Sequence, residues 1–343
     1  MILVSWGANT PHHILPGWEH TSKGVNTVEL WQLKQMQSLP LEAKIIKSQQ
    51  RIREWYEHWD GNVYVSFSGG KDSTVLLHLV RQLYPDVPAV FCDTGLEFPE
   101  IKEFVRQTEN VTVLRPDMSF KKVIEKYGYP VISKRQAQYI RDVRTTKSDV
   151  LKKLRLTGIR RNGKFSPYSK ISDKWHFLID APFQISEKCC DVMKKKPFTD
   201  YTKETGRMPY VGTMASEGAN RELEWLQTGC NAFENRRPKS MPLSFWLEGD
   251  IWEYLKTKDV PYSKIYDMGY PRTGCIFCMF GCHLEPYPNR FQKLSQTHPK
   301  LYEYCMKPAS EGGLGLAEVL DYIGVDYEFR GEQLRLEWEE DAG

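Results

Sequence analysis

Residues 63–80 read VYVSFSGGKDSTVLLHLV, and this stretch decides the fold of the chain. Its first five residues are β-branched or aromatic with one serine, which predicts a short buried strand. A glycine pair follows, and the apolar residues after Ser73 recur at helical spacing. The stretch therefore predicts a strand, a tight loop and a helix in direct succession.

The loop at 68–73 has the composition of a phosphate-binding loop. Glycine permits positive φ, so successive N–H groups can turn toward one anion, and the helix N-terminus adds partial positive charge. Lys71 adds a mobile full charge, while Ser68 and Ser73 add hydroxyl donors. The Walker A spacing is absent. The plainer alternative is a glycine turn without a ligand.

Strands and helices alternate around this loop. The alternation predicts βαβ units and an α/β fold with a doubly wound, mainly parallel sheet. Because ligands bind at the carboxyl ends of such strands, the loop and Asp93-Thr94-Gly95 are expected at one edge. The expected strands lie at 63–67, 87–92, 111–114 and 211–213, the expected helices at 41–59, 99–108, 120–127 and 244–258, and a polar tail after them.

Length and composition indicate a globular protein. The 343 residues are 41% hydrophobic and 27% charged, enough for one large core or two modest ones. No apolar run approaches the roughly 18–20 residues that cross a bilayer. The first residues lack the basic region of a signal peptide, so we expect a cytoplasmic protein with no membrane partner. His12-His13, in an N-terminal extension at 1–45, favour a surface or packing role over metal binding.

The segment from Lys134 to Lys174 is strongly basic. It holds thirteen Lys or Arg against three Asp, whereas the whole chain carries a net charge of +3. Aromatic residues are interleaved with these charges, which suits a polyanion with stackable bases. Nucleic acid is the favoured partner, and a small phosphorylated substrate and a solvated surface are the alternatives. Asn162-Gly163 is typical of a β-hairpin tip.

The eight cysteines favour metal binding over disulfides. In a reducing compartment clustered cysteines are more often metal ligands. Cys189-Cys190 and, 84 residues later, Cys275-x-x-Cys278 together offer four thiolates for zinc or an iron–sulfur cluster. The adjacent pair favours the cluster mildly, and Ile276-Phe277 would shield it. Cys282 is a spare ligand, a sulfur carrier or a core thiol, while Cys92, Cys230 and Cys305 are expected in the core.

Several motifs resemble those of a known superfamily. The loop resembles the Ser-Gly-Gly-x-Asp-Ser loop of the PP-loop ATP pyrophosphatases, which cut ATP between its α and β phosphates. Together with it, four more blocks resemble the phosphoadenosine/adenosine phosphosulfate reductase family. They are Asp93–Pro99, Ser186–Cys190, Asp259–Tyr262 and Tyr266–Cys275. The resemblance implies a Rossmann-like, adenine nucleotide α hydrolase-like domain at 46–285 with an iron–sulfur-binding C-terminal part, followed by a tail region at 286–343.

The resemblance also implies site residues. A 4Fe–4S cluster would be bound by Cys189, Cys190, Cys275 and Cys278, with zinc as the alternative. Catalytic roles fall on Lys71, Asp72 and Ser73, with Mg²⁺ sharing the charge of ATP. The nucleotide-binding residues would be Ser66, Ser68, Gly69, Gly70, Lys71, Asp72, Ser73, Asp93, Thr94 and Gly95.

Two departures from the reductases shape the functional hypotheses. Residues 327–343 lack the cysteine nucleophile of the reductases, and the phosphate loop is complete where theirs is usually degenerate. The first hypothesis is an ATP-using sulfur-transfer enzyme that adenylylates nucleic acid, supplied by a cysteine desulfurase. A sulfonucleotide reductase with an atypical nucleophile is the second, and a non-catalytic nucleotide-binding subunit the third. The sequence leaves the oligomeric state open.

Overall fold

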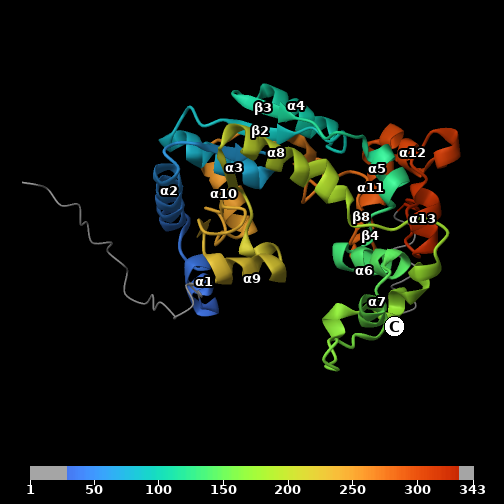
Figure 1. Ribbon diagram of the computed structural model, residues 1–343. Coiled ribbons are helices and arrows are strands. Elements are labelled where there is room, and N and C mark those ends of the chain that lie inside the picture. The colour runs from blue at the N-terminus through green and yellow to red at the C-terminus, as the bar shows by residue number, and fades with distance from the viewer. Residues whose placement is uncertain (1–28, 332–343) are drawn as a thin grey trace, which may run out of the picture. The chain divides into compact units, whose positions relative to one another are not determined.

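The computed structural model describes residues 29–331. The expectations for His12-His13 and for residues 332–343 lie outside the described residues. In the described part, no helix is both long and apolar enough to cross a membrane. The elements are α1 (Leu30–Gln37), α2 (Leu41–His58), β1 (Val63–Ser66), α3 (Lys71–Leu83), β2 (Ala89–Cys92), α4 (Pro99–Gln107), β3 (Val111–Leu114), α5 (Phe120–Tyr127), β4 (Val131–Ile132), α6 (Lys134–Thr145), α7 (Asp149–Thr157), α8 (Lys196–Thr205), β5 (Met208–Val211), α9 (Ala219–Thr228), β6 (Asn231–Ala232), β7 (Lys239–Ser240), α10 (Glu248–Thr257), β8 (Met279–Phe280), α11 (Arg290–Thr297), α12 (Pro299–Met306) and α13 (Leu316–Tyr322) (Figure 1).

The described residues form two compact units, the first comprising 29–67, 71–89 and 207–261. Its strands follow the order β1-β5-β7-β6. Strand β1 pairs with β5 in parallel, from Val63 opposite Met208 to Ser66 opposite Val211. Strand β7 is parallel to β5, and only the β6–β7 pair is antiparallel. The strands confirm the predicted mainly parallel α/β sheet.

The core of the first unit lies where α2, α3 and α10 pack together. Helix α2 turns its apolar face inward, so that Ile52 and Trp55 are fully buried. The hydroxyl of buried Tyr210, on β5, donates to the Ile52 carbonyl at 2.7 Å. Lys44 is also buried, and it pairs with Asp250 at 2.6 Å, which satisfies its charge. The core therefore ties the sheet to the helices that flank the phosphate loop.

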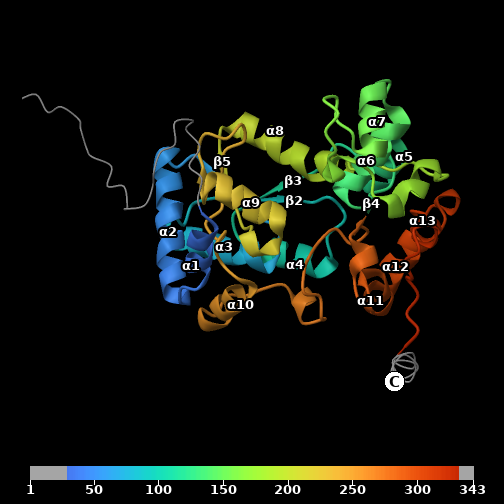
Figure 2. The same cartoon turned by 90° about the horizontal axis from the view of Figure 1, so that it is seen from below.

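The second unit comprises 68–70, 90–206 and 262–331. Strand β3 neighbours β2 in its sheet, while β4 and β8 form a separate parallel pair in which Val131 faces Met279. Helices α6 and α7 lie side by side, and α11, α12 and α13 follow one another at the C-terminal end of the described chain (Figure 2). The unit thus contains strands β2 and β3, the β4–β8 pair, and two groups of helices, α6–α7 and α11–α13.

Two elements begin three or more residues away from the expected position, and one segment differs in kind. The strand expected at 211–213 is β5 at Met208–Val211, and α10 begins at Glu248 rather than 244. The polar tail is wrong for residues 290–322, which form α11–α13 and bury Phe291, Leu316 and Leu320. Short helices separated by Pro and Gly hide their apolar face from a simple periodicity search, which explains this miss. The predicted domain limits at 45 and 285 stay predictions.

Candidate functional site: a phosphate loop and a cysteine centre

The two loop glycines are required by space. Gly69 has φ +71°, and a Cβ there would lie 2.9 Å from methyl groups of both Ile101 and Val105. Gly70 has no positive φ, yet a Cβ on it would lie 2.7 Å from Oγ1 of Thr273. Its N–H donates to Oγ of Ser68 at 3.3 Å. Close packing on both glycines fixes the backbone course of the predicted phosphate loop.

Helix α3 begins at Lys71, so its N-terminal N–H groups follow the glycine pair directly. The Lys71 side chain is only 4% exposed, and its Nζ lies 3.3 Å from Oδ1 of Asp72 and 3.4 Å from Oε1 of Glu248. Burial raises the pKa of Asp72, and the charge of Lys71 counteracts part of that rise. Ser73 is buried one position further on. The start of α3 thus holds a buried cation where an anion would meet the helix dipole.

The conformation of residues 93–97, directly after β2, is fixed by hydrogen bonds with side chains of the same segment. Thr94 donates its hydroxyl to Oε1 of Glu97 at 2.7 Å and its N–H to Oε2 at 3.0 Å. Oδ1 of Asp93 accepts the Gly95 N–H at 3.1 Å and pairs with Lys102 at 2.8 Å. Partial burial works against the Asp93 charge, but these two partners outweigh it and lower its pKa. This segment is pre-formed at the carboxyl end of β2, where nucleotide binding is expected.

A polar chain connects this segment to the cysteines. Lys194 lies 3.7 Å from Oε1 of Glu97 and bonds the Cys275 thiol. Burial would lower the pKa of Lys194, but the charges of Cys275 and Glu97 raise it instead. The N–H of Ile276 also donates to the Leu96 carbonyl at 2.8 Å. Sequence reasoning missed Glu97 and Lys194, although the first stands inside a quoted motif and the second five residues after Cys189.

The four predicted ligand cysteines lie in the second unit, where burial and their own charges raise the pKa of Cys189, Cys275 and Cys278. Burial raises the pKa of Cys189, and the charges of Cys190, Cys275 and Cys278 raise it further. Burial likewise raises the pKa of Cys275 to about 11, although Lys194 opposes the rise. Thiols separated by 84 residues in sequence are thus electrostatic neighbours.

The four cysteines are not arranged around a single metal ion. Among the residues that the structure describes, no group of three or more His, Cys, Asp or Glu side chains is arranged to hold one metal ion. In a 4Fe–4S cluster each cysteine thiolate binds a different iron, so the four sulfurs need not converge on one point. Ile276 and Phe277 are 5% and 4% exposed, as expected for residues beside such a centre. The donor set is compatible with an iron–sulfur cluster, which stays a proposal.

The other four cysteines are core thiols. Cys92, Cys230, Cys282 and Cys305 are all buried. Burial raises the pKa of Cys282 to about 12, and its thiol donates to the Met279 carbonyl at 3.1 Å. Burial also raises the pKa of both Cys92 and Cys305 to about 12. These thiols are protonated at neutral pH and shielded from solvent, so none is suited to nucleophilic attack.

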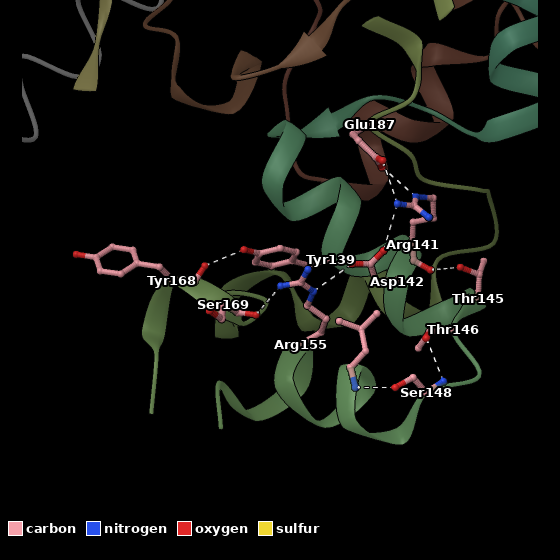
Figure 3. A network of polar contacts seen from close by, with 11 residues as sticks. Tyr139, Arg141, Asp142, Thr145, Thr146, Ser148, Arg155, Tyr168, Ser169 and Glu187 are labelled. Carbon is pink, nitrogen blue, oxygen red and sulfur yellow. Dashed lines mark hydrogen bonds and ion pairs between the residues drawn. The ribbon is translucent and has the colours of Figure 1, made fainter. Parts of the chain in front are cut away.

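Part of the basic segment is structural. Arg155 stacks its guanidinium over the Tyr139 ring at 3.7 Å and pairs with Asp142 at 3.1 Å (Figure 3). Arg141 forms two 3.0 Å bonds to Glu187. Arg144 donates to the carbonyls of residues 179, 181 and 183. These three arginines hold α6 and α7 against the chain that leads to Cys189.

Lys170 is half-buried and pairs with Asp173 at 2.7 Å, and the other cations of the segment face solvent. The exposed cations are Lys134, Arg135, Lys147, Lys152, Lys153, Arg160, Arg161, Lys164 and Lys174. Ile159 and Phe165 pair as an antiparallel bridge around Asn162-Gly163, which confirms the predicted hairpin tip. Phe165 is 62% and Tyr168 77% exposed beside it. Exposed aromatic rings thus stand among the exposed cations of this segment.

Comparison with known families identifies the family of the chain. The phosphoadenosine phosphosulfate reductase domain family matches residues 62–172 and 164–280, and the chain belongs to this family. The resemblance inferred from the motifs is therefore confirmed. Family members are enzymes of sulfonucleotide chemistry, and the family is nucleotide-binding.

Individual relatives are similar to this chain at low sequence identity. The chain is 25% identical over 237 residues to the adenosine 5′-phosphosulfate reductase of Staphylococcus epidermidis, covering 68% of this chain and 76% of that one. It is 24% identical over 282 residues to an uncharacterised protein of Methanocaldococcus jannaschii, covering 80% of this chain but only 54% of that protein. A phosphoadenylyl-sulfate reductase structure from Candida auris shares 16% identity and a TM-score of 0.40, over 72% of this chain and 96% of that one.

Proposed function

We propose that this protein cleaves ATP between the α and β phosphates in order to adenylylate a nucleic-acid acceptor for sulfur transfer. The observation that carries the proposal is the complete loop. Two sterically required glycines lead into a helix whose first residue, Lys71, is a buried cation. Binding of a nucleotide alone does not require a lysine buried at that position.

The proposed chemistry proceeds in two displacements. An acceptor oxygen of the nucleic acid attacks the α-phosphorus of ATP, and pyrophosphate leaves with the electron pair of the broken P–O bond. The helix N-terminus and Lys71 stabilise the charge that builds up on the leaving group. Asp72, once deprotonated, would bind the Mg²⁺ that accompanies ATP. A sulfur nucleophile then displaces AMP, so that sulfur replaces the activated oxygen.

The cysteine centre supplies the sulfur side of the proposal. Cys189, Cys190, Cys275 and Cys278 would hold the 4Fe–4S cluster, which when bound would hold or deliver sulfur. Lys194 bonds Cys275 and contacts Glu97, so it couples the charge of the thiolate set to the segment after β2. Sulfur would be supplied by a cysteine desulfurase. Zinc remains the alternative occupant of these thiols.

The exposed part of the basic segment is the proposed nucleic-acid surface. Its cations would contact phosphates, and Phe165 and Tyr168 would stack on unpaired bases. The three structural arginines would keep this surface in shape without contacting the polyanion themselves. A small phosphorylated substrate would use only part of so large a surface.

Two other functions are the alternatives to this proposal. A sulfonucleotide reductase is favoured by family membership and by relatives named as such reductases. Against it, each cysteine outside the proposed ligand set is buried and protonated at neutral pH. A non-catalytic nucleotide-binding subunit would need no nucleophile, but it does not explain the buried Lys71.

Parallel assays with two substrates separate the three functions. The protein is purified without oxygen and incubated either with α-labelled ATP, Mg²⁺ and mixed cellular nucleic acid, or with adenosine phosphosulfate and a thiol reductant. The proposal predicts AMP that appears only with nucleic acid. Sulfite release from adenosine phosphosulfate without ATP cleavage would instead establish the reductase. Failure of both reactions would establish the non-catalytic subunit.

A further inference from the structure

Helix α10 brings a carboxylate to the buried lysine at the start of α3. The two helices pack against each other within the first unit, and Glu248 is the first residue of α10. Its Oε1 lies 3.4 Å from Nζ of Lys71. The Lys71 side chain is only 4% exposed, whereas the Glu248 side chain is 60% exposed. A buried cation is therefore paired with a carboxylate that lies largely in solvent.

Two other carboxylates lie in the same neighbourhood, but each is held in place. Asp72 follows Lys71 on α3 and is tethered beside it by the helix backbone, at 3.3 Å from Nζ. Burial raises the pKa of Asp72, Lys71 counteracts this rise, and the charges of Glu217 and Glu248 add to it. Glu217 accepts the N–H of residue 214 at 3.1 Å and lies 3.6 Å from the guanidinium of residue 221. Glu248 is the most exposed of the three, so its contact is the easiest to break.

The pairing of Lys71 with Glu248 has a physical cost and a physical benefit. A cation removed from water is destabilising unless an anion accompanies it, and Glu248 supplies that anion. A phosphate offers Lys71 the same negative charge and the same kind of acceptor oxygen. Two anions in contact with one ammonium group repel each other. A bound phosphate and Glu248 therefore compete for Lys71.

We infer that Glu248 takes the place of a phosphate on Lys71 when no nucleotide is bound, and leaves Lys71 when the pyrophosphate part of a nucleotide arrives. The inference rests on the proposed function, because it takes Lys71 as the phosphate ligand. It goes beyond that function by giving α10 control over affinity. Glu248 keeps the buried lysine paired between turnovers, weakens the binding of pyrophosphate, and thereby speeds the release of this product.

Calorimetric titration of the full chain with inorganic pyrophosphate tests the inference. Mg²⁺, ATP and nucleic acid are left out, and ionic strength is held constant with chloride. Glu248→Gln removes the competing charge at nearly constant shape and should bind pyrophosphate about tenfold more tightly than the unaltered protein. Glu248→Ala should change affinity in the same direction, and it serves if the first variant does not fold.

Two further variants complete the experiment. Glu253→Gln removes one carboxylate from an exposed position of the same helix, so it is the matched control and should bind as the unaltered protein. Lys71→Gln should bind at least tenfold more weakly, because the ammonium group that holds the probe is lost.

The outcomes separate this inference from the proposed function. Tighter binding by the Glu248 variants, with Glu253→Gln unchanged, supports the inference. Unchanged or weaker binding by the Glu248 variants, while Lys71→Gln still loses affinity, overturns the inference and leaves the phosphate loop in place. Equal tightening by Glu253→Gln also overturns it, because the effect would then be one of overall charge. Absence of saturable binding, or equal binding by Lys71→Gln and the unaltered protein, overturns both.

Discussion

The Oγ1 atom of Thr273 lies 2.7 Å from the position that a Cβ on Gly70 would take. Thr273, which precedes Cys275 by two residues, therefore packs directly on the second glycine of the phosphate loop. The Thr273 hydroxyl is also 3.2 Å from that of Tyr266. The contact explains why a glycine is needed at a position whose φ any residue accepts.

This contact predicts a rescue. Gly70→Ala should lower AMP formation at least tenfold, because the new methyl group displaces either Thr273 or the loop. Thr273→Ala removes Oγ1 and should have a smaller effect alone. The double variant should regain much of the lost activity. A double variant no better than Gly70→Ala, with unchanged circular dichroism in each protein, would show that Thr273 does not set the space over Gly70.

The cysteine centre predicts a metal content. Protein purified without oxygen should contain about four irons and absorb in the visible range, and Cys275→Ser should lose most of both. Cys230→Ala alters a buried thiol outside the ligand set and should keep its iron. One zinc and no colour would instead favour the zinc alternative. Equal iron in both variants would contradict the ligand assignment.

The basic segment predicts two separable roles, of which the first is structural. Arg144→Met leaves three backbone carbonyls without their donor and should destabilise the protein by about 3 kcal/mol. Lys147→Met, an exposed neighbour, should change stability little. Chemical denaturation measures both. Similar stabilities would show that the carbonyls find other partners.

The second role is stacking on unpaired bases. Tyr168→Ala should weaken binding of single-stranded nucleic acid about tenfold, because the 77% exposed ring is lost. Tyr168→Phe keeps the ring and should bind as the unaltered protein, which separates stacking from loss of the hydroxyl. Fluorescence anisotropy at fixed salt measures the affinities. Normal binding by Tyr168→Ala would remove this residue from the proposed surface.

His283 predicts a pH dependence of stability. Burial lowers its pKa and Lys174 lowers it further, so the folded state holds the ring neutral below the ordinary value of 6.5. The unfolded chain then binds a proton that the folded chain does not. The free energy of unfolding should therefore fall as pH drops below about 6.5, until the folded pKa is reached. His283→Gln should flatten this fall in denaturation curves, whereas His176→Gln should keep it.

Local patterns predicted much of the fold. The β-branched run at 63–66, the glycine pair and the helical spacing after it appear as β1, the loop and α3. The first and last residues of α5 and β3 were also predicted, because each element is a continuous run of residues with a single hydrophobic periodicity. Helices α11–α13 were missed, since none exceeds eight residues and their apolar faces are completed only by tertiary packing.

The candidate site was only partly predictable. The loop and the cysteines carry fixed spacings that can be recognised in a sequence. The contacts of Thr273 with Gly70 and of Lys194 with Glu97 join segments about 100 or more residues apart, so no local pattern reports them. The structural arginines likewise could not be told from exposed cations by composition, because only their partners distinguish them.

The central claim is that Lys71 and its loop cleave ATP at the α phosphate, and AMP release tests it most directly. The protein, purified without oxygen, is incubated with α-labelled ATP, Mg²⁺ and nucleic acid, beside Lys71→Ala and the exposed-lysine control Lys256→Met. The account predicts labelled AMP from the unaltered protein and the control, and a loss of at least a hundredfold in Lys71→Ala, about 3 kcal/mol of transition-state stabilisation. Full activity of Lys71→Ala, or labelled ADP in place of AMP, would contradict it.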